Sequence, residues 1–359
     1  MSNLSFLVNK QAIQQTKVIE ETLLDKSTLQ EGEILVAVEK FALTANNITY
    51  AVTGNRIGYW HFYPNHNEWG TIPAWGFAKV TASAHETIKE GTRIYGFLPM
   101  KQQVILRPSK LQANGFSDIS AHRTKLPAVY NFYNDVHKDP SFEQSHEAIE
   151  MIFRPLFTTS FLLDYYLTVN EFFNAEQVII TSASSKTGFT LAFLLAQRKQ
   201  ITNKTLKITA LTSGRNKAFV ESLGFYDQVH TYSHLRQLPA SSASIIDFAG
   251  NHNLLAMLQE QLGDLHQHTT LVGLSHWEED SQVRAEGELF FAPDWVKRLN
   301  QDWGYAKFQE KLAQAWQTFS NGEQKIQFKT VEGLEQLNSS YQEVLKGQVE
   351  ANSAYVVEP

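Results

Sequence analysis

The chain has 359 residues, a hydrophobic content of 43% and a formal net charge of −6 that arises from 31 basic and 37 acidic residues. This length exceeds what one hydrophobic core usually organises, so two domains are expected. Charges of both signs are interspersed along the chain, which leaves no positive footprint for nucleic acid or for an anionic membrane. Neither nucleic acid nor a membrane is therefore expected as a partner.

The sequence contains no cysteine, which excludes disulfides and every metal site with a thiolate ligand. His61, His66 and Glu68 offer nitrogen and oxygen ligands, but their spacing is irregular and they lie in an aromatic loop, so no metal is expected. Residues 1–15 lack the basic and apolar segments of a secretion signal, and no later stretch has about 18 continuous apolar residues. These features predict a cytoplasmic protein.

The first 110 residues show short strand patterns separated by turn residues. Residues 33–41, 76–83 and 92–97 are β-rich, and each follows a Gly or Pro turn signal. This texture predicts an all-β first domain. An apolar and aromatic stretch over residues 155–173 predicts a helix that leads into a second domain. Residues 114–150 fit either a loop insertion or a pair of helices.

From residue 177 onward strands and helices alternate. The predicted strands are residues 178–181, 206–211, 229–231, 244–247 and 269–274, and the predicted helices are residues 188–198, 216–223 and 254–262. This order indicates βαβ units around a parallel sheet. Helical spacing also predicts helices over 294–319 and 331–345, before a final strand over 354–357. The fold class is therefore α/β, with one domain over 1–150, completed by 300–359, and a dinucleotide-binding domain over 151–299.

A turn of small residues follows the strand predicted over 178–181 and precedes an apolar helix. Backbone N–H groups at a helix N-terminus hold a pyrophosphate, and bulky side chains would keep it away. Only the last glycine of the G-x-G-x-x-G fingerprint is present, but strand, turn and helix follow one another as the fingerprint requires. The alternative is an ordinary tight turn. The predicted cofactor-binding residues here are Ser182, Ala183, Ser184, Ser185, Lys186, Thr187 and Gly188.

The segment after the next strand favours NADP(H) over NAD. Dinucleotide folds that use NAD usually place Asp or Glu there for the ribose hydroxyls, whereas this chain has Ser213 and Arg215. A guanidinium presents a fixed fork of charged donors, which suits the oxygens of a 2′-phosphate. The alternative is a helix N-cap by Ser213 with a solvated Arg215.

Taken together, these segments resemble the medium-chain dehydrogenase/reductase superfamily, and within it the zinc-independent quinone oxidoreductase and enoyl reductase branch. The resemblance lies in residues 32–43, 46–54, 73–80 and 90–97 of the first half and in residues 181–188, 216–224 and 247–250 of the second. It covers nearly the whole chain and implies a GroES-like β domain plus a Rossmann domain with a doubly wound parallel sheet. It also implies that Phe248, Ala249 and Gly250 pass the nicotinamide ribose.

The sequence departs from the zinc-dependent alcohol dehydrogenases of that superfamily. Those enzymes have a cysteine in the segment that resembles residues 43–47 and a His-Glu pair where this chain has Trp75-Gly76. Zinc-assisted alcohol oxidation is therefore not expected. Residues 59–64 and 288–295 resemble a bacterial and fungal offshoot of unknown function, so the resemblance implies the fold and the cofactor but not the substrate.

The reaction that this resemblance implies is hydride transfer from NADPH to a polarised double bond in an enone, quinone or enoyl-type small molecule. Such a site needs a proton donor and a group that orients the carbonyl. Tyr50 and Tyr59 are the candidate donors, and Asn46 or Asn47 is the candidate for orienting the carbonyl or the nicotinamide ribose.

Other readings of the sequence remain open at this point. Ser184, Ser185 and Lys186 stand where glycines are usual, which favours an inactive NADP(H)-binding sensor or scaffold protein with the same fold. A lyase or thioesterase-like enzyme without cofactor is less favoured, because no G-x-S-x-G motif is present. A homodimer is expected, because exposed sheet edges of this fold are usually covered by a second subunit.

Overall fold

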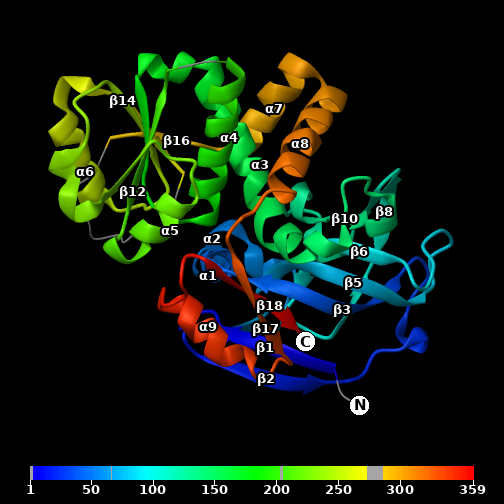
Figure 1. Cartoon of the computed structure of the whole chain (residues 1–359). Coiled ribbons are helices and arrows are strands. Elements are labelled where there is room, and N and C mark those ends of the chain that lie inside the picture. Colours follow the sequence, from blue (N-terminus) through cyan, green and yellow to red (C-terminus); the bar gives the residue numbers. More distant parts are fainter. Residues whose placement is uncertain (1–2, 66, 203–204, 273–285) are drawn as a thin grey trace. The chain divides into compact units, whose positions relative to one another are not determined.

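The computed structural model describes residues 3–65, 67–202, 205–272 and 286–359. The chain divides into two compact units (Figure 1). Unit 1 consists of Met1–Ile152 and Ile326–Pro359, and unit 2 of Phe153–Lys325. The first boundary expected from the sequence lies after residue 150. Residues 300–325, however, belong to unit 2 and do not complete the first domain.

Unit 1 is built around a nine-stranded sheet with the order β17-β18-β3-β5-β6-β10-β9-β8, in which β7 also pairs with β3. The three strands expected in the first 110 residues are present as β3 (Ile34–Leu43), β5 (Pro73–Ser83) and β6 (Arg93–Pro99). The other strands of this sheet are β7 (Gln103–Leu106), β8 (Pro108–Gln112), β9 (Gly115–Asp118), β10 (Phe132–Asp135), β17 (Gln327–Glu332) and β18 (Ser353–Glu358).

Three further strands and three helices complete unit 1. Strands β1 (Asn3–Asn9), β2 (Thr16–Glu21) and β4 (Trp69–Gly70) form a small antiparallel sheet. The helices are α1 (Ala45–Val52), α2 (Gly54–Ile57) and α9 (Leu337–Leu345). The core strands β3 and β5 lie unusually close where Phe41 opposes Gly76. A Cβ on Gly76 would lie 2.3 Å from the carbonyl oxygen of Lys40, so this crossing requires glycine.

Two expectations for unit 1 are corrected by the structure. Residues 114–150 are neither a loop insertion nor a helix pair, because they contain β9 and β10 of the main sheet, joined by short 3-10 turns. The helix expected over 331–345 begins only at Leu337, because residues 327–332 form β17 in parallel with β18. In both segments sheet pairing outweighs local preference.

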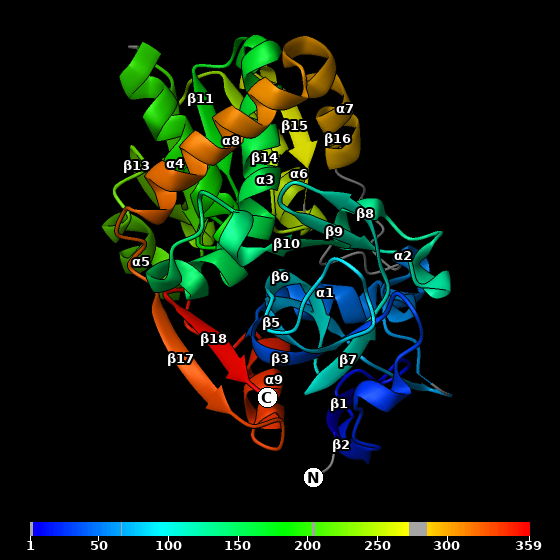
Figure 2. The same ribbon diagram turned by 90° about the vertical axis from the view of Figure 1, so that its right-hand side faces the viewer.

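Unit 2 contains a six-stranded parallel sheet with the order β13-β12-β11-β14-β15-β16 (Figure 2). Its strands are β11 (Gln177–Ile180), β12 (Lys207–Thr212), β13 (Gln228–Thr231), β14 (Ala243–Asp247), β15 (His266–Leu271) and β16 (Glu288–Leu289). Its helices are α4 (Lys186–Thr202), α5 (Lys217–Ser222), α6 (His252–Leu262), α7 (Ala292–Trp303) and α8 (Tyr305–Ser320). In chain order the strands run 3-2-1-4-5-6, the order of the dinucleotide-binding sheet, which confirms the predicted α/β class.

Helix α3 (Glu147–Val169) begins eight residues before the expected start and ends four residues before the expected end. Pro155 lies inside the helix rather than at its start. The four residues that follow Asn170 all have positive φ angles between 52° and 59°, a left-handed turn that terminates the helix. The apolar pattern continues to Phe173 because Phe172 is buried and Phe173 stacks on His268, with 3.7 Å between ring centroids.

Aromatic side chains fill the space between α3, α4 and α8 in unit 2. Phe319 of α8 lies at the centre, and its ring centroid is between 5.2 and 5.8 Å from four other phenylalanine rings. These neighbours are Phe153, Phe157, Phe189 and Phe193. Much of the aromatic content in the second half of the chain is therefore core packing that holds α8 to the Rossmann domain.

We expect Phe319→Ala to lower the free energy of unfolding by about 3–5 kcal/mol, because it removes a ring that is only 2% exposed and leaves a cavity. Urea denaturation followed by circular dichroism measures the loss. Phe291→Ala, which truncates a side chain that is 57% exposed, is the matched control and should change stability by less than about 0.5 kcal/mol. Equal losses in the two variants would contradict the central position of Phe319.

Candidate functional site

The small-residue turn of unit 2 lies where the chain passes from β11 to α4, at the carboxyl edge of the parallel sheet. In this strand order the chain reverses direction of winding between β11 and β14, and ligands of open α/β sheets bind outside the carboxyl ends of the strands at such a point. Ser182, in the turn, has a φ of 46°, a left-handed conformation that glycine adopts more easily. The turn is thus formed without the first glycine of the fingerprint.

The N-terminus of α4 is capped by Ser185, whose side-chain oxygen accepts a hydrogen bond from the N–H of Gly188 at 3.1 Å. A Cβ on Gly188 would lie 2.9 Å from that oxygen and 3.0 Å from the carbonyl oxygen of Ser182, so the turn closes this tightly only with glycine. The first backbone N–H groups of a helix have no acceptor inside the helix, and α4 begins in this turn. The turn therefore offers backbone donors to an anion.

Lys186 is the first residue of α4 and is partly buried. Burial penalises its charged form and lowers the pKa of Lys186 from 10.5 to about 8. An anion bound at the same helix end would favour the charged form again. Lys186 is thus a cation whose charge state can change near neutral pH.

A buried hydrogen bond joins the ends of the two strands beside the turn. The hydroxyl of Thr181 donates to Oδ1 of Asp247 at 2.5 Å, and both side chains are buried. Oδ2 of Asp247 accepts from the N–H of Gly250 at 2.9 Å, and Oγ1 of Thr181 accepts from the N–H of Phe248 at 3.0 Å. The segment Phe248, Ala249 and Gly250 is therefore held by Asp247 and Thr181, which the sequence analysis did not assign to the site.

The end of β12 carries the residues expected to select NADP(H). The side-chain oxygens of Thr212 and Ser213 are buried and have no hydrogen-bond partner in the described part of the chain. Arg215 is exposed in the 3-10 turn that follows. The amide of Asn216 donates to Oγ of Ser184 at 3.0 Å, which ties this turn to the turn before α4. The structure thus brings the two predicted halves of the cofactor site together.

Two tyrosines that the sequence analysis did not single out also contact the turn. The hydroxyl of Tyr232 accepts a hydrogen bond from the N–H of Ser182 at 3.0 Å, and the hydroxyl of Tyr226 donates to the carbonyl oxygen of Ala183 at 2.8 Å. Burial raises the pKa of both tyrosines, so both hydroxyls stay protonated. No local motif marks them, because they reach the turn only through the fold.

Unit 1 contains a cluster of six aromatic side chains that we call the aromatic wall. Its members are Tyr50, Tyr59, Phe62, Trp75, Phe97 and Tyr130. Phe97 is central, with its ring centroid 4.7 Å from that of Tyr130 and 5.3 Å from that of Tyr50. The hydroxyls of Tyr59 and Tyr130 are 3.1 Å apart and hydrogen-bonded to each other. Sequence reasoning found Tyr50 and Tyr59 but missed Tyr130, which is distant in sequence.

Burial is the main cause of the raised pKa of Tyr50 and of Tyr59, and the negative charge that a neighbouring tyrosinate would carry adds to it. Both tyrosines are therefore neutral hydroxyls that can donate a proton through the physiological range.

The two neighbouring asparagines of α1 have different environments. Asn47 is buried, its Oδ1 accepts from the N–H of Thr44 at 2.7 Å, and its Nδ2 donates to the carbonyl oxygen of Pro73 at 3.1 Å. It completes a capping box at the start of the helix. Asn46 is only partly buried and lies beside Tyr50. Of the two, Asn46 retains the freedom to orient a substrate.

Among the described residues no group of three or more His, Asp or Glu side chains could hold a metal ion. His61 and Glu68 are exposed, and Glu68 accepts a hydrogen bond from Asn9 at 3.3 Å. His66 lies outside the described residues. The same part of the chain contains no helix with the length and apolar character of a membrane span.

Comparison with solved structures shows the fold. Similar structures include the CurK enoyl reductase (14% identity, TM-score 0.58, covering 100% of this chain and 99% of that one) and a putative NADPH:quinone reductase from Bacillus thuringiensis (14%, 0.57, 100% and 99%). CurA from Vibrio vulnificus in complex with NADPH is 13% identical, with a TM-score of 0.61 and coverage of 99% and 98%. These likenesses show that the chain shares the fold of these reductases, with a GroES-like domain and a Rossmann domain.

A search of the curated proteins gives no match. A family model described as "Protein of unknown function (DUF2855)" matches residues 41–350, which is most of the chain. The chain therefore belongs to this family, the DUF2855 proteins, within the fold of the quinone and enoyl reductases.

Proposed function

We propose that this protein is a zinc-independent reductase that uses NADPH to reduce the polarised double bond of an enone, a quinone or an enoyl-type substrate. The observation that carries the proposal is the turn between β11 and α4, which places a helix N-terminus and Gly188 at the switch point of a dinucleotide-type sheet. The similar structures that are described as an enoyl reductase, an NADPH:quinone reductase and an NADPH complex support it.

The residues of unit 2 fit the two phosphate groups of NADP(H). Ser184 and Thr187 would donate their N–H groups to the diphosphate, and Lys186 would add a positive charge. The buried hydroxyls of Thr212 and Ser213 lack partners among the described residues, and with Arg215 they would hold the 2′-phosphate. The cofactor, when bound, supplies the hydride.

The residues of unit 1 supply the proton side of the reaction. In the proposed role Tyr59 donates a proton to the reduced substrate, and Tyr130, hydrogen-bonded to it at 3.1 Å, passes a proton on to Tyr59. Asn46 or Tyr50 would donate a hydrogen bond to the substrate carbonyl and so stabilise the negative charge that develops on its oxygen. Catalysis by a thiolate-bound zinc is not part of the proposal, because the chain has no cysteine.

One observation favours a second candidate, an NADP(H)-binding sensor or scaffold protein without turnover. Ser182 holds a left-handed φ of 46°, and the hydroxyl of Tyr232 already occupies its N–H. With this N–H already bonded, the turn departs from the glycine-rich turn of the usual fingerprint, and such a departure is compatible with a protein that binds the cofactor but does not turn it over. Binding of NADPH without oxidation by any enone or quinone would favour this candidate.

The expected homodimer and the expected cytoplasmic location stay predictions.

The first test measures the cofactor preference through Arg215. Titration followed by cofactor fluorescence should show NADPH binding to the wild type, and Arg215→Met should weaken it about tenfold or more. The reason is that a charged hydrogen bond to phosphate is worth about 1.5–3 kcal/mol. NADH, which lacks the 2′-phosphate, is the matched control, and its affinity should not change. If the wild type does not bind NADPH at millimolar concentration, the reductase proposal fails.

The second test uses the pKa of about 8 at Lys186. Below this pH Lys186 carries a positive charge, and above it the charge is lost, so the affinity for NADPH should fall by as much as about tenfold between pH 7 and pH 9. Lys186→Met should weaken binding at pH 7 and abolish this pH dependence. Lys207→Met, at an exposed lysine of β12, should leave it intact. An unchanged pH profile in Lys186→Met would show that this lysine does not face the cofactor.

The third test concerns the proton donor. Tyr59→Phe keeps the ring and removes the hydroxyl, so kcat for NADPH oxidation in the presence of an active enone or quinone should fall about 10²-fold or more. NADPH affinity should stay within error of the wild type. Tyr305→Phe, at a tyrosine that is 66% exposed, is the control and should retain full activity. Retention of wild-type kcat in Tyr59→Phe would remove Tyr59 from the mechanism.

A further inference from the structure

We infer that Arg123 is a positioning residue. It contacts the two segments that carry Tyr59 and Tyr130 and so fixes the distance between the hydroxyls of these two tyrosines. The expected effect on kcat rests on the proposed function. The expected effect on the distance between the two hydroxyls rests only on contacts within unit 1. Arg123 is buried, and it has the largest fully buried side chain in the described residues. A guanidinium in such a place needs a reason, because burying a charge is costly unless it is paired.

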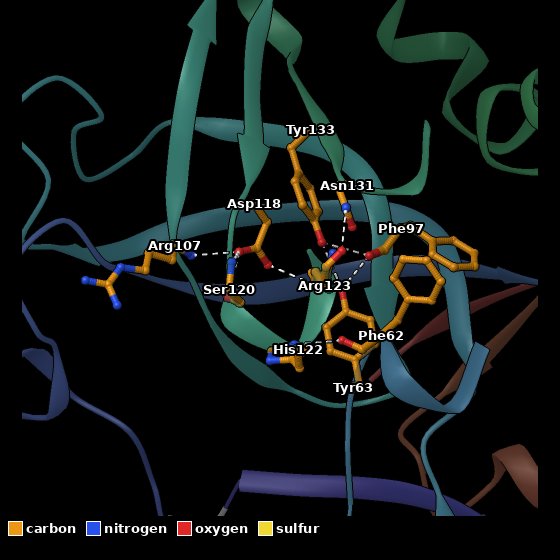
Figure 3. A network of polar contacts seen from close by, with 10 residues as sticks. All are labelled: Phe62, Tyr63, Phe97, Arg107, Asp118, Ser120, His122, Arg123, Asn131 and Tyr133. Atoms are coloured by element: carbon orange, nitrogen blue, oxygen red, sulfur yellow. Dashed lines mark hydrogen bonds and ion pairs between the residues drawn. The ribbon is translucent and has the colours of Figure 1, made fainter. Parts of the chain in front are cut away.

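The charge of Arg123 is paired with Asp118 at the end of β9. Nε of Arg123 lies 3.1 Å from Oδ2 of Asp118, and both side chains are about 1% exposed (Figure 3). Oδ1 of Asp118 is also in use, since it accepts hydrogen bonds from the N–H groups of Arg107 and Ser120 and from the hydroxyl of Ser120. The carboxylate is therefore fixed by the backbone, and it fixes the guanidinium in turn.

Aromatic rings surround the guanidinium. Its central carbon lies 4.6 Å from the ring centroid of Tyr63, 5.5 Å from that of Phe62 and 5.8 Å from that of Tyr133. These are cation–π distances, and such contacts strengthen when water is excluded. Tyr63 and Phe62 belong to the segment that carries Tyr59, whereas Tyr133 belongs to β10, three residues after Tyr130. The guanidinium of Arg123 thus contacts both the segment that carries Tyr59 and the segment that carries Tyr130.

Two of these residues, Tyr63 and Tyr133, also bind Phe97, the central residue of the aromatic wall. The hydroxyls of Tyr63 and Tyr133 both donate to the carbonyl oxygen of Phe97, the latter at 2.9 Å, and they lie 2.9 Å from each other (Figure 3). The ring of Phe97 contacts those of Tyr59 and Tyr130 on the other side. A shift of either tyrosine would therefore move the residue against which the hydroxyl pair packs.

Two backbone contacts tie the segment of Arg123 to both partners directly. Nε2 of His122 lies 3.2 Å from the carbonyl oxygen of Phe62, within hydrogen-bond distance. The amide of Asn131, the residue after Tyr130, donates to the carbonyl oxygen of Arg123 at 3.3 Å. Phe62 is three residues after Tyr59, and Asn131 is one residue after Tyr130. Both tyrosines therefore lie close in sequence to a residue that contacts the Arg123 segment. Loss of the cation should separate the hydroxyls while the sheet remains intact.

The test removes both charges together, because a lone buried charge would itself unfold the protein. In the double variant Asp118→Asn with Arg123→Met, the asparagine keeps Oδ1 as an acceptor, and the methionine keeps an unbranched apolar stem but removes the guanidinium. We expect kcat to fall about 10–100-fold, since a misplacement of about 1 Å costs this much, with KM and NADPH affinity close to the wild type. Arg123→Lys, which keeps the charge, should recover part of kcat. Lys125→Met, at an exposed lysine of the same segment, should behave as the wild type.

A crystal structure of the double variant gives a readout that needs no activity. The distance between the Tyr59 and Tyr130 hydroxyl oxygens, 3.1 Å here, should open beyond hydrogen-bond range. An unchanged distance, or an unchanged kcat, would overturn the positioning role. Should the double variant fail to fold, Tyr63→Phe keeps the ring, removes the hydroxyl that contacts the Phe97 carbonyl and the Tyr133 hydroxyl, and tests the same displacement. If the wild type itself oxidises no NADPH, the proposed function fails, while the hydroxyl distance still decides the role of Arg123.

Discussion

The hydrogen bond between Thr181 and Asp247 is the contact around which the candidate cofactor site is arranged. It joins the carboxyl ends of β11 and β14, the two strands between which the order of the sheet reverses. Because both partners are buried, the bond is strong and costly to break. The same two side chains hold the N–H groups of residues 248–250, so the turn before α4 and the segment after β14 keep fixed positions relative to each other.

The turn itself shows how the link from β11 to α4 closes with one glycine in place of the three of the fingerprint. Ser182 adopts the left-handed conformation, at a cost of about 1–2 kcal/mol for a residue with a Cβ. Two hydrogen bonds offset that cost: the N–H of Ser182 donates to the hydroxyl of Tyr232, and the hydroxyl of Tyr226 donates to the carbonyl oxygen of Ala183. Gly188 is retained because any Cβ there would collide with the cap of α4. The departure from the fingerprint is thus local, and distant tyrosines compensate for it.

The aromatic wall of unit 1 follows a related principle, since a buried charge supports a set of neutral hydroxyls. Tyr59 and Tyr130 are kept protonated by burial. Behind the wall, the charge of Arg123 is paired with that of Asp118, and the hydroxyls of Tyr63 and Tyr133 bond to the carbonyl of Phe97. Hydrophobic packing alone would place the rings but would not define the angle of each hydroxyl. Directional bonds to a rigid backbone carbonyl do so.

The sequence by itself determined the α/β class, the alternation of strands and helices after residue 177, and the small-residue turn that ends at Gly188, because these depend on local periodicity and on backbone sterics. It also placed Ser213 and Arg215 after β12, since that position follows from chain order. Only the tertiary structure decided that residues 115–118 and 132–135 are sheet strands, that residues 300–325 belong to unit 2, and that Asn47 caps a helix. The same holds for Tyr130, Tyr232, Thr181 with Asp247, and Arg123. Each of these depends on contacts between segments far apart in sequence, where sheet pairing, burial and the pairing of a charge outweigh local preference.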